Sequence, residues 1–129
     1  MLDSLRQYKA DVFAALGHPS RVAIVENLKT GEMTVGQLCA AIGVEQSNAS
    51  QHLSVLRNKH IVQTRKHGNQ IYYRLRDPVF GRLLDALRGF FVAHMTEALQ
   101  LVRDEQAATE PDRGKPQPAR TAAKARARR

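Results

Sequence analysis

The stretch from residue 43 to residue 75 changes its periodicity halfway, and this change constrains the fold more than any other feature. In its first part the apolar residues recur at helical spacing, as Ala49, Leu53 and Leu56. After residue 61 apolar and polar residues alternate, which is typical of a strand with one buried face. The turn sequence His67-Gly68-Asn69 divides this alternating part in two. The pattern therefore predicts a helix that begins near Gln46 and leads into a two-stranded hairpin.

The outer face of this predicted helix is polar. Its side chains are short hydrogen-bond donors and acceptors, namely Gln46, Ser47, Asn48, Ser50, Gln51 and His52. Side chains of this kind near the start of a helix can read base edges in the major groove of DNA. The basic hairpin is a candidate wing against the DNA backbone or minor groove, with expected contacts from Arg65, Lys66, His67, Gly68, Asn69 and Gln70. Thr34 and Arg57 are expected to lie on phosphates.

Shorter helices are expected ahead of this unit. The first ends at Gly17, because a glycine without a Cβ atom suits a helix stop. Ser20 is the expected N-cap of the second helix, and Thr34 is the expected N-cap of the third. Gly43 then opens the turn into the polar helix. Helix, glycine-containing turn and helix form a DNA-binding unit, so we expect a mainly α fold with a β-hairpin wing, a winged helix-turn-helix.

Composition bounds the remaining possibilities. A chain of 129 residues with 43% hydrophobic content supports one small domain with a modest core. No apolar run approaches the roughly 20 residues that cross a bilayer, and residues 1–4 lack the signature of a secretory signal. We therefore expect a cytoplasmic protein without a membrane partner. The single cysteine, Cys39, excludes both an intramolecular disulfide and a four-thiolate zinc site.

The net charge of +8 is concentrated at the C-terminal end. Residues 111–129 contain seven Lys or Arg and one acidic residue, which gives +6, whereas residues 1–110 carry only +2. Without large apolar side chains this segment cannot offset the entropy of ordering. We expect a DNA-binding and dimerisation domain over residues 1–103 and a disordered basic tail over residues 104–129. The tail is either a solubility segment or an electrostatic arm on phosphates.

Three segments carry a family resemblance. Residues 15–21 read Ala-Leu-Gly-His-Pro-Ser-Arg, residues 50–53 read Ser-Gln-His-Leu ahead of Leu56-Arg57, and residues 71–75 read Ile-Tyr-Tyr-Arg-Leu. In this order and spacing they resemble the ArsR family of bacterial winged-helix repressors, over about residues 5–100. The resemblance implies a homodimeric repressor that leaves its DNA operator when an inducer binds.

After Asp77-Pro78 a long amphipathic helix is expected, with an apolar stripe longer than a domain of this size needs for its own core. A second copy of the chain is the expected cover, with the first and last helices forming the interface as in the family. The expected interface residues are Leu5, Val12, Phe80, Leu84, Leu87, Phe91 and Met95. A two-fold dimer would meet DNA half-sites roughly 34 Å apart, in an inverted-repeat operator.

The resemblance also implies two metal sites whose ligands are missing here. The positions of the family's cysteine pair hold Thr34 and Gly36, which cannot supply the thiolates that soft metals require. Of the family's second site only Asp77 remains, and the other positions hold Val79, Phe90 and Ala93. His94 and Glu97 form a pair one turn further on, without the other half of a site. We expect no metal and no cofactor, and the inducer is unknown.

Other functional classes have less support. The sequence has no phosphate-binding glycine loop and no nucleophile elbow, so we expect no enzyme. The alternative is an architectural, sequence-tolerant DNA-binding protein driven by the basic tail, which would lose nearly all affinity on truncation. A third possibility is an operator-binding protein that answers no small molecule and responds only to its own abundance or to oxidation.

Overall fold

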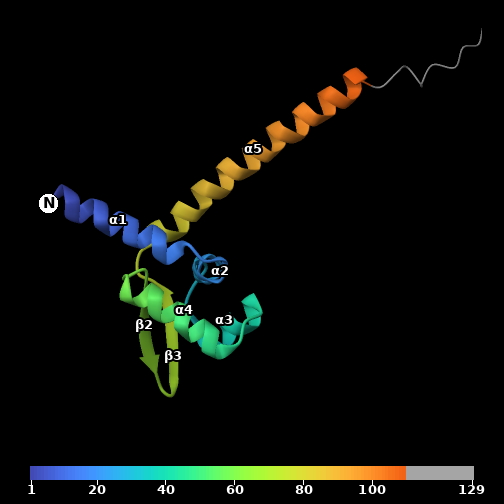
Figure 1. The fold of residues 1–129 in the computed structure, drawn as a ribbon. Coiled ribbons are helices and arrows are strands. Elements are labelled where there is room, and N and C mark those ends of the chain that lie inside the picture. The colour runs from blue at the N-terminus through green and yellow to red at the C-terminus, as the bar shows by residue number, and fades with distance from the viewer. Residues whose placement is uncertain (110–129) are drawn as a thin grey trace, which may run out of the picture. The chain divides into compact units, whose positions relative to one another are not determined.

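The computed structural model describes residues 1–109 as helices joined to a small sheet (Figure 1). The elements are α1 (Leu2–Leu16), α2 (Pro19–Leu28), β1 (Met33–Thr34), α3 (Val35–Ile42), α4 (Gln46–Asn58), β2 (Val62–His67), β3 (Gln70–Leu75) and α5 (Val79–Thr109). The chain divides into two compact units, residues 1–90 and residues 91–129. The first unit holds the sheet and the core, and the described part of the second, residues 91–109, is helical. None of the helices in the described part is both long and apolar enough to cross a membrane.

The helix ends follow local sequence, with one correction. As predicted, α1 is followed by Gly17 and α3 is capped by Thr34, whose hydroxyl accepts from the Gln37 amide at 3.2 Å. The N-cap of α2 is His18, not Ser20, and the Ser20 amide donates to His18 Nδ1 at 3.1 Å. The reason is Pro19, because its fixed φ and missing N–H suit the first helical position. The cap therefore moves to the residue before it.

The turn between α3 and α4 matches the prediction. Gly43 has φ 71°, a left-handed conformation that glycine adopts without a steric penalty. Its amide donates to the Cys39 carbonyl at 2.9 Å and closes α3. Three residues later α4 begins at Gln46, as expected.

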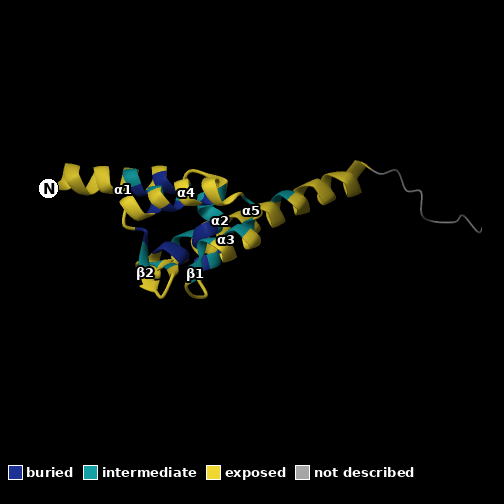
Figure 2. Ribbon diagram, turned by 90° about the horizontal axis from the view of Figure 1, so that it is seen from below, coloured by how far each residue is buried: buried dark blue, intermediate teal, exposed yellow. Residues whose placement is uncertain are grey.

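The core of the first unit lies where the helices and strands meet (Figure 2). Its buried members are Val12, Ala15, Leu16, Ile24, Val25, Leu28, Leu38, Leu53, Leu56, Ile61, Val62 and Phe80, and Ala49 is also buried. The predicted stripe of Ala49, Leu53 and Leu56 is therefore confirmed as the face of α4 that packs inward. Burial of this stripe fixes which side of α4 faces solvent.

The wing is an antiparallel hairpin of β2 and β3 with β1 added on the other side of β3. The register runs from Val62 opposite Leu75 to His67 opposite Gln70. His67 thus ends a strand, and the turn consists of Gly68 and Asn69, with φ 61° at Gly68. The sequence did not predict β1, because a two-residue strand shows no periodicity.

The last helix begins after a local cap and runs past the expected end of the domain. The Asp77 carboxylate accepts from the Val79 amide at 2.8 Å. The tail was expected to start at residue 104, whereas α5 continues to Thr109. Most of the tail, residues 110–129, lies outside the described residues.

Candidate nucleic-acid interface

Five polar side chains at the start of α4 are presented to solvent without internal partners. Gln46, Ser47, Asn48, Ser50 and Gln51 are all exposed. Within residues 1–109 none of these side chains makes a hydrogen bond or ion pair with another residue. They share a rigid helix whose opposite face is fully buried. Their donors and acceptors are therefore available to base edges without breaking an existing contact.

His52 departs from this pattern. It is half-buried, and its ring lies 4.3 Å from the His18 ring, measured between centroids. Burial lowers the pKa of His52 below its ordinary value, and the charges of His18 and Arg21 lower it further. From the sequence, this side chain was expected in the DNA groove. Instead it packs against the beginning of α2, because its place on α4 borders the buried stripe.

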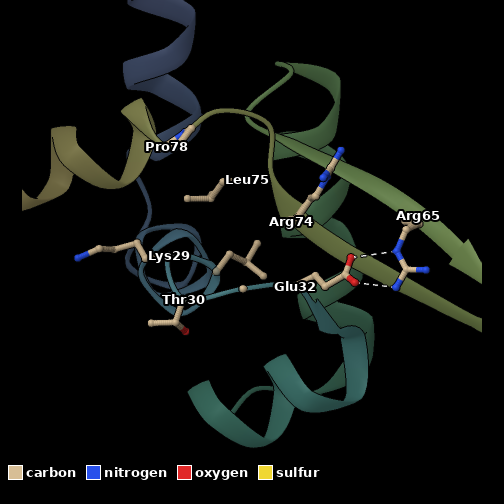
Figure 3. Close-up of a pocket in the computed structure, with 9 residues that line it drawn as sticks. Lys29, Thr30, Glu32, Arg65, Arg74, Leu75 and Pro78 are labelled. Atoms are coloured by element: carbon tan, nitrogen blue, oxygen red, sulfur yellow. Dashed lines mark hydrogen bonds and ion pairs between the residues drawn. The ribbon is translucent and has the colours of Figure 1, made fainter.

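The wing tip is exposed, but one of its expected contact residues is already engaged. Lys66, His67, Gly68, Asn69 and Gln70 are exposed to solvent. The Arg65 guanidinium is bound to the carboxylate of Glu32 through two hydrogen bonds, Nε to Oε2 at 3.2 Å and Nη2 to Oε1 at 2.6 Å (Figure 3). It also lies over the Tyr72 ring, 4.9 Å from its centroid. Glu32 was not identified from the sequence.

A second wing cation is also held within the hairpin. Arg74 lies opposite Gln63 in the strand pair. With the Gln63 amide oriented to satisfy both groups, its oxygen accepts from Arg74 Nε at 2.7 Å and from a terminal guanidinium nitrogen. By contrast, Lys66 has no side-chain partner among residues 1–109. The basic groups of the wing therefore differ in how free they are to reach a phosphate.

The two remaining expected phosphate contacts lie on different elements. Arg57 is exposed in the last turn of α4. Thr34 is half-buried in β1, where its hydroxyl oxygen caps α3 and its amide donates to the Gln37 side chain at 2.9 Å. The Thr34 hydroxyl can still donate its own proton to an acceptor.

An open cleft of about 450 Å³ lies beside the wing. It is lined by Leu28, Lys29, Thr30, Gly31, Glu32, Arg65, Arg74, Leu75 and Pro78. Its basic groups do not converge on its centre, since the Lys29 amine points away (Figure 3). That amine pairs with Asp85 on α5, while the Lys29 stem packs over Gly81, where a Cβ atom would come within 2.8 Å of it. The cleft is therefore lined by the end of α2, the loop that follows it, the wing and Pro78 just before α5.

The positions of the family's metal ligands do not fit a metal. Thr34 uses its hydroxyl as a helix cap and Gly36 has no side chain. Asp77 caps α5, and its neighbouring position holds the hydrocarbon side chain of Val79. Across residues 1–109, no three His, Cys, Asp or Glu side chains are grouped so that they could hold a metal ion.

The expected interface residues separate into two groups. Val12 and Phe80 are only 7% exposed and belong to the core of their own chain, which corrects their assignment to a dimer interface. Apolar side chains at helical spacing fit either role, and here the neighbouring helices cover them. Leu84 is half-buried, and the exposed members are Leu5, Leu87, Phe91 and Met95. Each of these four presents apolar surface that residues 1–109 leave uncovered.

Comparison with known proteins agrees with this geometry. Residues 18–64 match the family described as bacterial regulatory protein, arsR family. The chain is 40% identical over 89 residues to the biofilm growth-associated repressor of Xylella fastidiosa, covering 69% of this chain and 78% of that protein.

Two solved structures share the fold. The transcriptional repressor BigR from Xylella fastidiosa superposes with a TM-score of 0.64 at 38% identity, covering 70% of this chain and 92% of that one. The homodimeric winged helix-turn-helix domain of a possible ArsR-family regulator from Mycobacterium bovis has a TM-score of 0.68 at 27% identity, with coverages of 74% and 88%. The expected fold class is thereby confirmed. The chain belongs to the ArsR family of bacterial regulatory proteins and is a DNA-binding transcriptional regulator with a winged helix-turn-helix fold.

Proposed function

We propose that this regulator is a repressor that binds an inverted-repeat operator as a homodimer and is released by an inducer that is still unidentified. The observation that carries the proposal is the exposed polar face of α4, which has no partners among residues 1–109 and lies opposite a fully buried stripe. The side chains of such a face can bind base edges with little reorganisation of the protein. Repression is supported by the relatives that are named repressors.

In this proposal α4 lies in the major groove and the wing lies along the backbone or minor groove. The base-reading side chains are Gln46, Ser47, Asn48, Ser50 and Gln51. Contacts to phosphate come from Thr34, Arg57 and the hairpin between Arg65 and Gln70. His52 is given a supporting role, because its ring packs against His18.

The proposed dimer uses the exposed apolar residues of the first and last helices. Leu5 on α1 and Leu87 on α5 are exposed in the first unit, and Phe91 and Met95 are exposed in the second. Large exposed apolar side chains that lie together on a surface favour a protein partner. The homodimeric Mycobacterium bovis relative supports a second copy of the chain as that partner. Two-fold symmetry would set the two α4 helices roughly 34 Å apart, one helical turn of DNA.

The proposed DNA target of this regulator would place it in the cytoplasm.

DNA selection with the purified full-length protein tests the proposal. The expected result is an inverted-repeat sequence that is bound at least about 10³ times more tightly than random duplex. Footprinting should then protect two half-sites on one face of the DNA. Enrichment of no sequence would contradict the proposal and favour the architectural alternative.

That alternative depends on the charge of +6 over residues 111–129. A binder driven by this segment would lose nearly all affinity when residues 111–129 are deleted, and would show little sequence preference before deletion. In the proposed repressor the deletion weakens binding to every duplex but leaves operator preference intact. The ratio of the two affinities therefore separates the candidates.

A further inference from the structure

The outer face of the wing gathers basic side chains around a single carboxylate. Directly opposed residues of an antiparallel pair point to the same side, so Arg65 and Tyr72 share a face, as do Gln63 and Arg74. The other face carries Val62, Tyr73 and Leu75, which pack on the core. The face with the two arginines is thus the solvent side of the hairpin.

Glu32 is held against this basic face by the fold. It directly precedes β1, whose residue Met33 pairs with Tyr73 of β3. The carboxylate takes two hydrogen bonds from Arg65 (Figure 3). Arg74 and His67 also act on it electrostatically, and all three groups lower the pKa of Glu32. The carboxylate therefore stays ionised at neutral pH.

The geometry of this pair matches the way arginine binds DNA phosphate. The planar guanidinium fork binds carboxylate and phosphate oxygens with the same two-point arrangement. Both side chains are substantially exposed, at 47% for Arg65 and 34% for Glu32. Such exposed pairs contribute little to folding stability. The main physical consequence of Glu32 is that it neutralises a cation on the surface proposed to meet DNA.

We propose that Glu32 is a built-in competitor of DNA phosphate for Arg65. It lowers the affinity of the wing for any duplex without changing which sequence is preferred. While Arg65 stays paired with Glu32 it neutralises no phosphate and releases no counterion from the DNA. Without the Glu32 charge, Arg65 is free to neutralise a phosphate and release its counterion. The inference rests on the proposed contact between wing and DNA.

The test is a salt titration of Glu32→Gln on a random duplex and on the selected operator, followed by fluorescence anisotropy. Each phosphate newly neutralised adds roughly 0.9 to the magnitude of the slope of log affinity against log salt. We expect that increase on both DNAs, with tighter binding at low salt and an unchanged ratio of the two affinities. The matched control is Glu26→Gln, which removes the same charge from an exposed position on α2. Circular dichroism verifies that both variants fold.

Arg65→Gln and the double variant complete the cycle. In the Arg65→Gln background, the Glu32→Gln change should no longer increase the slope. The proposal is overturned if Glu32→Gln matches the Glu26→Gln control, if it weakens binding, or if the increase persists without Arg65. Weaker binding would show that the pair positions the wing, and a persistent increase would show a general charge effect. If the wild type prefers no sequence at all, the proposed function fails separately.

Discussion

The two regions proposed to face DNA, the start of α4 and the wing, are prepared in opposite ways. At the start of α4 five polar side chains have no partner within the described part of the chain, and the other face of the helix is buried. On the wing, Arg65 and Arg74 are held by Glu32 and Gln63, while Lys66 is free among the described residues. We therefore propose a division of labour, in which the polar side chains of α4 recognise the DNA sequence and the wing supplies positive charge that Glu32 reduces.

The largest expected effect on operator binding comes from disrupting the proposed homodimer. Leu87→Glu places a charge on exposed apolar surface of α5, outside the core of its own chain. The variant should stay folded but become monomeric and lose operator binding, because burying an unpaired charge in an interface is strongly unfavourable. Light scattering and circular dichroism measure the two properties. Arg88→Glu, which puts the same residue at the next exposed position, is the control. A wild-type protein that is monomeric at micromolar concentration would contradict the dimer.

The next prediction concerns how much the buried face of α4 contributes to the stability of the fold. Leu53→Ala removes a side chain that is almost fully buried in the core. Loss of transfer energy and the remaining cavity should cost about 2 to 5 kcal/mol of the free energy of unfolding. Urea denaturation measures this cost, and Ser54→Ala, an exposed change on the same helix, is the control. A loss below about 1 kcal/mol would show that α4 is not held by this stripe.

A smaller effect concerns the histidine contact behind α4. The folded protein lowers the pKa of His52 below 6.5, through burial and then the charges of His18 and Arg21. As the pH falls below 6.5 the unfolded chain binds the proton first, so stability decreases until the lowered pKa of the folded state is passed. His52→Gln should reduce this acid-induced loss, measured by thermal unfolding between neutral and mildly acidic pH. His67→Gln removes an exposed histidine from the wing tip and should keep the wild-type pH dependence. Equal pH dependence in His52→Gln and the wild type would refute this role.

Local signals predicted α4, the Thr34 cap, the turn at Gly43 and the hairpin, because each depends on neighbours within a few residues. What the sequence missed depends on distant pairs. Arg65 and Glu32 are 33 positions apart, and Lys29 and Asp85 are 56 apart. No periodicity relates such residues, so their contact becomes visible only in the folded chain.

The same reason explains the residues whose roles changed. His52 follows the polar run of α4 in sequence, yet the approach of α2 brings the His18 ring against it. Val12 and Phe80 have the spacing of an apolar stripe, and only the packing of the chain decides that they belong to the core. Periodicity identifies an apolar face, but it does not identify what covers that face.

The central claim, that α4 supplies sequence preference and the wing supplies charge, is tested most directly by the ratio of operator affinity to random-duplex affinity. We expect Gln51→Ala to weaken operator binding by about 1 to 3 kcal/mol and to leave random-duplex binding nearly unchanged. Lys66→Gln should weaken both by the same factor and keep the ratio. An equal loss on both DNAs for Gln51→Ala, or a changed ratio for Lys66→Gln, would contradict the division of labour between the two regions.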